Sequence, residues 1–440
     1  MSEAAPQKAQ ASGCPFSGSA AAEPVSLLSP RAMSCPYGVY KQLRSEEPVK
    51  YLPDQNIWIV TRYDDVEYVL ENPERFSAKE SPSSTNAYRA FPEALAILAQ
   101  SRAVPRARTL MLADLPHHTR YRTTAQRALA PARTLKEFSP KLRTIVDELI
   151  DGFCESGRAE IVGALSIPLP MALVAHIFQV SPDWISKLKG WSDSFFAALS
   201  GSVGEKEVIK AAHDTLEFEN FILDRIAERR QTPVDDFLGR LIAQPEGEEK
   251  LTDPEIVNIC SQILVGGNES SINMLSNLIY LIATTEGLQQ KLQADPARIP
   301  ALVEESLRME PPLQAMYRIT RHEEDFNGVK VPPNSKLMLN FGSANRDETY
   351  YQDGESFDLD RDNRETIHLA FGRGIHACAG QALARKEAVF TIEKVIARLP
   401  NLRLSTDLPP ERAPLFGVRG FRTLNVEFDP TPRMAPAVNQ

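Results

Sequence analysis

The chain has 440 residues, of which 42% are hydrophobic and 24% are charged, so it is long enough to bury a sizeable core. The formal net charge is −9, and the sequence has no block of Lys and Arg residues. Both features argue against a nucleic-acid-binding protein. The sequence contains no stretch of about 18 apolar residues, so no membrane span is predicted. The five cysteines are scattered and odd in number, which is unlike a disulfide framework and favours the reducing cytoplasm.

The ends of the chain differ from its middle. Residues 1–25 are rich in Ala, Ser, Pro and Gln and lack both the basic start and the apolar segment of a signal peptide, so we expect a disordered tail. No Gly/Ser-rich or Pro-rich linker divides the chain afterwards, which predicts a single domain over residues 26–430. Residues 431–440 are expected to form a second disordered tail.

The N-terminal part predicts a hairpin followed by helices. Residues 49–52 and 57–61 are rich in β-branched and aromatic residues around an Asp-Gln-Asn turn. Residues 64–72 have helical spacing, and an apolar patch over 91–98 predicts a short helix inside an otherwise irregular stretch. Amphipathic helices are then expected from about 135 to 250.

A basic cluster containing His118 and Arg122 opens a predicted helix behind Pro116. A solvated charged face is the ordinary explanation of such a cluster. A functional role for this cluster is taken up below, where a family resemblance bears on it.

A capping box at Thr252–Glu255 begins a pattern of apolar residues at helical spacing that reaches residue 282. This predicts one helix of about thirty residues. Its middle contains Gly266 and Gly267, which cost roughly 1 kcal/mol each relative to alanine. The glycines either allow a packing kink or let a flat cofactor lie close, with Glu269 and Ser270 reaching the gap.

Prolines bound a short predicted helix over residues 300–309, in which Glu305 and Arg308 are i,i+3 neighbours. Such pairs are usually weak and solvated. Further along, residues 328–340 predict a hairpin.

The loop from Phe371 to Gly380 contains three glycines in ten residues and precedes a helical pattern that runs to Arg398. Cys378 therefore lies just before a helix N-terminus, where the helix dipole favours a thiolate. Cys378 is either a metal ligand or a buried free cysteine on a tight turn. A zinc site is less favoured, because no second cysteine lies nearby.

Six residues of this loop resemble, in type and spacing, the haem-ligand loop of the cytochrome P450 family: Phe371, Gly372, Gly374, His376, Cys378 and Gly380. The resemblance implies that Cys378 is the axial ligand of haem b, and that Phe371, Arg373, His376 and Gly380 belong to the cofactor-binding loop. It also implies a mainly α fold with a small β portion, in which the haem lies between a long central helix and the Cys378 loop.

Upstream segments are similar to other segments of the same family, in the expected order, over about residues 30–428. Residues 114–122 resemble a propionate-binding stretch, with Leu115 in place of a proline. The resemblance implies that His118, Arg122, Arg318 and His376 bind the haem propionates.

The central helix resembles the family helix that crosses the oxygen-binding face of the haem. The resemblance implies that Gly266 lies against the haem, and that Glu269 and Ser270 relay protons with ordered water. Serine in place of the usual threonine keeps the hydroxyl and loses the methyl group that restricts χ1.

The pair of Glu305 and Arg308 is similar to the family's Glu-x-x-Arg pair, and Arg361 to its third partner. The three residues are expected to form a buried structural network. The resemblance also implies an apolar substrate pocket walled by Val265, Leu313, Met316 and Phe416.

The implied activity is monooxygenation of a small to mid-sized hydrophobic molecule by O2, as hydroxylation or oxidative demethylation. Electrons would come from NAD(P)H through a ferredoxin and its reductase, which would dock on the Cys378 side, near Arg373, Arg385 and Lys386. A monomer is expected. Two rivals stay open: a peroxide-driven peroxygenase, and a haem-binding sensor, which would need neither Glu269 nor Ser270.

Overall fold

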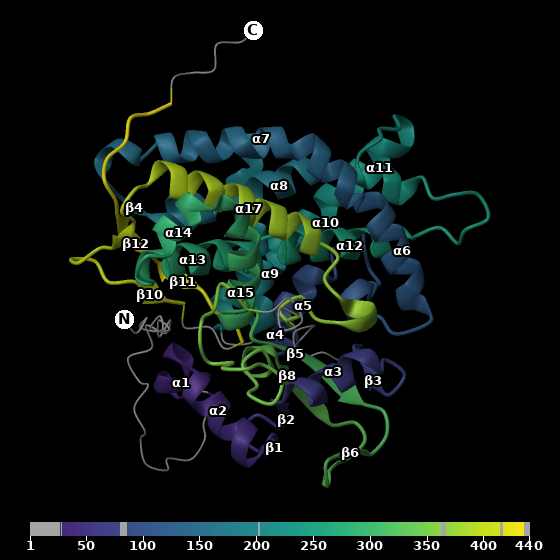
Figure 1. The fold of residues 1–440 in the computed structure, drawn as a ribbon. Helices are drawn as coiled ribbons and strands as arrows, with labels where there is room; N and C mark the ends of the chain where they lie inside the picture. Colours follow the sequence, from purple (N-terminus) through teal and green to yellow (C-terminus); the bar gives the residue numbers. More distant parts are fainter. Residues whose placement is uncertain are drawn as a thin grey trace.

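Helices account for most of the molecule, and the strands lie in two places in Figure 1, below the helices and at their left side. The computed structural model describes residues 27, 29–79, 86–200, 203–361, 367–413 and 417–434. The mainly α prediction with a small β portion is confirmed.

A five-stranded sheet forms the larger part of the β portion, in the order β1-β2-β8-β5-β3. Its strands are β1 (Val49–Leu52), β2 (Ile57–Val60), β3 (Phe76–Ser77), β5 (Ala315–Thr320) and β8 (Lys336–Asn340). The predicted hairpin is confirmed, because β1 pairs antiparallel with β2. β2 pairs parallel with β8, and β5 pairs antiparallel with β8 and β3. Three further small sheets contain β4 (Arg158–Glu160), β6 (Glu324–Phe326), β7 (Val329–Val331), β9 (Arg403–Leu404), β10 (Glu411–Arg412), β11 (Phe421–Thr423) and β12 (Asn425–Glu427).

The helices surround one large hydrophobic core. Shorter helices lie early in the chain or beside the sheet: α1 (Pro30–Ser34), α2 (Tyr37–Glu46), α3 (Tyr63–Glu71), α4 (Asn86–Arg89), α5 (Pro92–Leu98) and α16 (Phe341–Ala344). The main helical part contains α6 (His117–Leu129), α7 (Pro131–Asp151), α8 (Pro168–Phe178), α9 (Ile185–Ser200), α10 (Glu205–Gln231), α11 (Phe237–Ile242), α12 (Asp253–Gly266), α13 (Glu269–Thr284), α14 (Leu288–Ala294), α15 (Ile299–Met309) and α17 (Gln381–Arg398).

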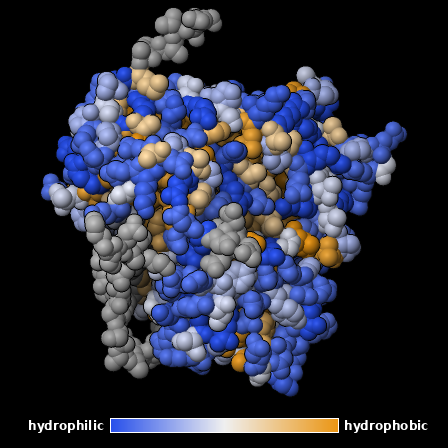
Figure 2. Space-filling model, in the orientation of Figure 1, coloured by the Kyte–Doolittle hydropathy of each residue, from blue (hydrophilic) through white to orange (hydrophobic). Residues whose placement is uncertain are grey.

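The face in Figure 2 is predominantly hydrophilic, with hydrophobic residues in small groups. No single helix in the described ranges has both the length and the apolar character to cross a membrane. The segments Val162–Phe178 and Pro182–Ala198 pass that criterion only as a pair, bent by 119°.

The predicted helix of about thirty residues is wrong in one respect, because it is two helices. α12 begins with the predicted capping box and ends at Gly266, and α13 begins at Glu269. Gly267 and Asn268 lie between them, and the Ser270 hydroxyl donates to the Gly266 carbonyl at 3.0 Å. Glycine's low helix propensity and this side-chain bond to a helix carbonyl explain the interruption.

The predicted hairpin over residues 328–340 is also paired differently. Val329–Val331 pairs with Glu324–Phe326, with Asn327 and Gly328 at positive φ in the turn. Lys336–Asn340 instead joins the five-stranded sheet. Both segments of the predicted hairpin are rich in β-branched or apolar residues, so either could pair with several other strands. Contacts made in the tertiary structure therefore decided which strand each segment joins.

The structure bears in part on two predictions, that the cysteines form no disulfide and that the ends of the chain are disordered tails. Cys154, Cys260 and Cys378 are free thiols, whereas Cys35 is disulfide-bonded, against the expectation from cysteine spacing. Residues 1–26 and 435–440 lie outside the described part. Within the segment expected to be a C-terminal tail, Thr431 donates its N–H to the Cys154 carbonyl at 3.0 Å.

A buried ionic network joins α15 to the segment that precedes the Cys378 loop. Arg308 binds both carboxylate oxygens of Glu305 at 2.7 and 2.8 Å, and Arg361 Nε lies 3.2 Å from the same carboxylate. Arg308 also donates to the carbonyls of Asn345 and Gly354 at 2.7 Å. Glu305, Arg308 and Arg361 therefore meet as the sequence predicts, and they tie a helix to an irregular segment.

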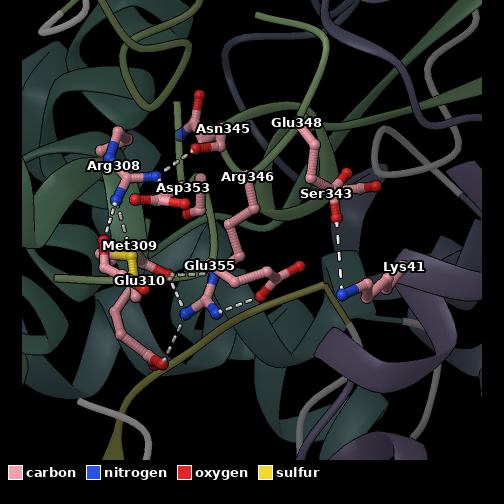
Figure 3. Close-up of polar contacts among 12 residues, drawn as sticks. Lys41, Arg308, Met309, Glu310, Ser343, Asn345, Arg346, Glu348, Asp353 and Glu355 are labelled. Atoms are coloured by element: carbon pink, nitrogen blue, oxygen red, sulfur yellow. Dashed lines mark hydrogen bonds and ion pairs between the residues drawn. The ribbon is translucent and has the colours of Figure 1, made fainter. Parts of the chain in front are cut away.

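A second group of charges continues this network, as Figure 3 shows. Arg346 donates to the Met309 carbonyl at 2.8 Å and to Glu355 at 3.0 Å. Its guanidinium also lies 3.6 Å from Glu310, which receives a hydrogen bond of 2.9 Å from Arg419. These contacts fix the end of α15 against the irregular segment after α16.

We expect Glu305→Ala to give poorly folded, cofactor-free protein. The substitution strands the buried positive charges of Arg308 and Arg361, at a cost of about 3–5 kcal/mol. Urea denaturation and the haem content after expression measure this loss. Glu323→Ala is the control, because Glu323 is 61% exposed and pairs only at 3.6 Å with Lys330. Normal haem content in Glu305→Ala would contradict the network.

Glu387 on α17 is a buried carboxyl group without a partner. Its side chain is 1% exposed, and neither oxygen has a hydrogen-bond partner within the described residues. Burial raises the pKa of Glu387 from 4.5 to about 8. The folded protein therefore keeps this proton at pH values at which the unfolded chain has lost it.

Glu387→Gln is expected to stabilise the protein at neutral pH and not at acidic pH. Between pH 4.5 and 8 only the unfolded state releases the proton, so wild-type stability falls as pH rises, by about 3 kcal/mol at pH 7. Urea titrations at pH 4.5 and pH 7 measure the difference between the two proteins. Glu393→Gln is the control on the same helix, because the Glu393 carboxylate has a partner, Arg143, at 3.1 Å. Equal gains at both pH values would contradict an unionised Glu387.

Candidate active site

The Cys378 loop is folded by two glycines that no other residue could easily replace. Gly372 and Gly374 have φ values of +65° and +68°. A Cβ on Gly374 would lie 2.4 Å from the Leu70 carbonyl oxygen on α3. The Cys378 N–H donates to the Phe371 carbonyl at 2.8 Å, which closes the loop. Cys378 is thereby presented three residues before Gln381, where α17 begins, as predicted.

Burial and hydrogen-bond donors act in opposite directions on the Cys378 sulfur. Burial raises the pKa of the thiol, while the N–H groups of Gly380 and Gln381 and the guanidiniums of Arg122 and Arg385 lower it. The helix N-terminus therefore favours the thiolate, as the sequence predicts, but the net direction of the pKa is upward. Desolvation outweighs the donors. A metal cation bonded to the sulfur would reverse this balance, because a coordinating thiol is deprotonated outright.

Four basic side chains from three separate segments gather near this loop. The His118 and His376 ring centroids are 4.3 Å apart, and both rings are influenced by the charges of Arg122 and Arg318. Burial, Arg318, His118 and Arg122 lower the pKa of His376 to about 2. Burial also lowers the pKa of Arg318 to about 10. The structure thus brings together the four residues that the sequence predicts as propionate partners; they are called the basic cluster below.

Among the described residues, no acid forms an ion pair with the arginines of the basic cluster. Arg318 is 6% exposed and donates to the Tyr317 carbonyl at 2.7 Å, and no ion pair of Arg318 or Arg122 occurs among the described residues. Asp114 is close enough to affect Arg318, but it is engaged by Arg321 at 2.5 Å and by Ser77 at 2.6 Å. Buried cations are normally paired, so this cluster suits an anionic ligand.

Gly266 leaves space beside the last turn of α12. It is exposed although α12 crosses the interior, and a Cβ built on it would meet nothing within 4 Å. Gly267 differs, because its Cβ would lie 3.1 Å from the Ile263 carbonyl and 3.3 Å from Val174 of α8. Gly266 therefore borders an open region, whereas Gly267 allows α8 to approach.

The predicted acid and alcohol lie at the break between α12 and α13. Glu269 accepts a hydrogen bond from Asn273 at 3.2 Å. Burial raises the pKa of the Glu269 carboxyl, while Lys189 and Asn273 lower it and Asp193 raises it. Ser270 donates to Gly266, so its hydroxyl lies at the same break. The arrangement places one acid with an upward-shifted pKa next to one alcohol.

The structure describes three of the four residues that were predicted to line the substrate pocket. Val265, Leu313 and Met316 are half-buried. Leu313 forms an isolated β-bridge with Val418, which joins the end of α15 to the C-terminal strands. Phe416 lies outside the described residues.

Arg373 does not join the basic cluster. Its guanidinium makes ion pairs of 2.5 Å with Glu67 and 2.6 Å with Glu71, both on α3. It therefore attaches the Cys378 loop to α3, and the four basic residues act without it.

The sequence interpretation missed a triad that supports the aromatic residue of the loop. Glu304 accepts two bonds from Arg385, at 2.7 and 2.9 Å, and lies 3.2 Å from His368 Nε2. Despite its burial, these partners lower the pKa of Glu304 to about 2. Arg385 lies over the Phe371 ring at 4.5 Å. No spacing signal connects Glu304 with His368, since 64 residues separate them.

The residues at this site fit a haem. A thiol on a Gly-closed loop supplies the iron ligand, the basic cluster supplies partners for two carboxylates, and the open space at Gly266 admits a flat ring. Each requirement is met by a different segment of the chain.

Comparisons with known proteins agree with this chemistry. The family model described as Cytochrome P450 matches residues 174–414, more than half of the chain. Putative cytochrome P450 YjiB of Bacillus subtilis (strain 168) is 30% identical over 390 residues, which cover 88% of this chain and 93% of the relative. Steroid C26-monooxygenase of Mycobacterium tuberculosis (strain CDC 1551 / Oshkosh) is 34% identical over 302 residues, which cover 68% and 80%.

A solved structure supports the same assignment. The crystal structure of CYP109E1 from Bacillus megaterium in complex with testosterone superimposes with a TM-score of 0.77 at 29% identity, covering 90% of this chain and 99% of that one. The chain therefore belongs to the cytochrome P450 family and is a haem-dependent monooxygenase of the bacterial type.

Proposed function

We propose that the protein binds haem b through Cys378 and inserts one atom of O2 into a mid-sized hydrophobic substrate. The basic cluster carries this proposal, because His118 and Arg318 are buried, Arg122 and His376 are half-buried, and neither arginine has an ion pair within the described part of the chain. The two haem propionates would supply the missing negative charges. When bound, the haem supplies dioxygen activation, and the protein supplies binding, orientation and proton delivery.

Glu269 and Ser270 are proposed to deliver protons. Burial raises the pKa of Glu269, which makes its carboxyl better able to hold a proton before passing it on. The Ser270 hydroxyl, which donates to Gly266, can orient a water molecule at the open space beside that residue. A sensor would need neither group, and a peroxygenase would receive its protons with the peroxide, so the pair favours oxygen activation.

Electrons are proposed to come from NAD(P)H through a ferredoxin and its reductase. We also propose that the enzyme is a monomer and works in the cytoplasm. Of the three cations predicted at the docking surface, Arg373 and Arg385 are engaged in ion pairs with glutamates. Lys386 is exposed and has no ion pair with another described residue. We therefore assign docking to the whole Cys378 face, with Lys386 as the cation that can meet an acidic partner.

Substitution of Cys378 tests the ligand. Reconstituted wild-type protein, reduced and exposed to carbon monoxide, should show the strongly red-shifted absorbance band of thiolate ligation, and Cys378→Ala should lose it. Cys154→Ala is the control, because Cys154 is also a buried free thiol. Persistence of the band in Cys378→Ala would refute the assignment.

Substitution of Ser270 tests proton delivery. Ser270→Ala should lower the product formed per NADH by roughly tenfold, with more peroxide released. Ser270→Thr should retain or improve coupling, because the β-branch restricts χ1. Ser261→Ala is a matched control, since Ser261 makes the same type of bond to the Val257 carbonyl at 3.0 Å in α12. Unchanged product per NADH in Ser270→Ala would exclude the role.

A spectral titration tests the substrate class. Because the crystal structure of CYP109E1 contains bound testosterone, we choose testosterone and hexadecanoic acid as probes of two hydrophobic classes. A probe that enters the pocket should displace water from the haem and shift its absorbance toward the five-coordinate form. A shift with testosterone alone would favour a steroid-sized substrate, and one with hexadecanoic acid alone would overturn that class.

A further inference from the structure

Asn268 occupies an unusual place for a polar side chain. It is the last residue of the break between α12 and α13, directly before Glu269, and its side chain is 0% exposed. Its backbone is non-helical, with φ −103° and ψ −80°. A leucine, which branches at the same carbon, would bury no polar atoms at this position, so the amide needs an explanation.

The two ends of the Asn268 amide are treated differently. Nδ2 donates to Ser192 Oγ on α9 at 2.7 Å, and Ser192 is 1% exposed. Oδ1 is buried and has no hydrogen-bond partner within the described residues. An unpaired buried acceptor is unfavourable, and a bound water molecule is the usual partner that satisfies it.

The same face of α9 carries the charges that act on Glu269. Lys189, Ser192 and Asp193 are spaced i, i+3 and i+4, so they lie on one side of the helix. Lys189 and Asp193 are ion-paired with each other, and both influence Glu269 electrostatically. α9 packs against α12, as Figure 1 shows. The break is therefore held from α9 by one hydrogen bond and by a pair of opposite charges.

We propose that Asn268 is a positioning residue of the proton-delivery path, anchored to α9 through Ser192 and holding an ordered water molecule on Oδ1 beside Glu269. The anchor fixes the break, and the break sets the directions of the Glu269 carboxyl and the Ser270 hydroxyl. The water extends the path from the protein surface. This inference rests on the proposed roles of Glu269 and Ser270.

A crystal structure of the holoenzyme tests the water directly. An ordered water should lie within about 3.2 Å of Asn268 Oδ1, and it should be absent from Asn268→Leu. A dry Oδ1, or a protein donor bonded to it, would overturn the proposal whatever the activity of the enzyme.

Coupling measurements test the role. With testosterone as the probe, or hexadecanoic acid if testosterone gives no spectral shift, Asn268→Leu should lower product per NADH roughly tenfold. It should also change the solvent deuterium effect on that ratio, which a purely structural role would not move. Haem content and the carbon monoxide band should stay normal.

Ser192→Ala cuts the same hydrogen bond from α9 and covers the case in which Asn268→Leu fails to fold. It should lower coupling in the same direction, and the double variant should be no worse than Asn268→Leu, because the two residues act through one bond. Ser186→Ala, an exposed serine of α9, is the control. Additive effects, or normal coupling in both single variants, would overturn the anchor.

Glu269→Gln separates this inference from the proposed function. If Glu269→Gln uncouples turnover while Asn268→Leu and Ser192→Ala do not, only the Asn268 role fails. If Glu269→Gln leaves coupling unchanged, the proton path itself fails. A loss of product explained entirely by lost haem would assign Asn268 a structural role and would also contradict the proposal.

Discussion

Positive charge that has no counterion among the described residues is the constraint on which this structure depends. Arg318 is buried on β5, Arg122 lies on α6 and His376 lies in the Cys378 loop, so three segments bring basic groups to one place. The nearest acid, Asp114, is occupied by Arg321. Such an arrangement is costly for the protein alone and favourable with a dianionic ligand. Ligand binding and folding are therefore coupled at this site.

The rest of the fold fixes the loop that carries the sulfur. Two neighbouring glutamates of α15 hold this loop, and each binds a different set of partners. Glu305 binds Arg308 and Arg361 and secures the preceding segment, whereas Glu304 binds Arg385 and His368 and secures the Phe371 ring. Arg373 attaches the same loop to α3. These ionic contacts replace the regular hydrogen bonds that an irregular loop cannot make.

The central helix shows the opposite behaviour, because it gives up regular structure at the proposed site. Local rules conflict there: two glycines, a buried asparagine and a serine bonded to a helix carbonyl occur within five residues. Conflicts of this kind are expected at functional positions, where stability is lost for chemistry. The break also connects α9 to Glu269 through Asn268, so the charged residues of α9 influence the pKa of Glu269.

The mainly α class and the burial of the Glu305 network were implied by the family resemblance. Local sequence patterns determined the β1–β2 hairpin, the loop around Cys378 and the i,i+3 spacing of Glu305 and Arg308. These features are written in short-range patterns: alternation, helical spacing, glycine placement and i,i+3 contacts. The assignment of the basic cluster needed the family resemblance, since no local pattern joins His118 with Arg318. Only the tertiary structure decided the break at Gly267 and Asn268, the pairing of Lys336–Asn340, the direction of the Cys378 pKa, and the partners of Glu304 and Arg373. Those outcomes depend on burial and on contacts between residues far apart in the chain, and neither is encoded in any short window of the sequence.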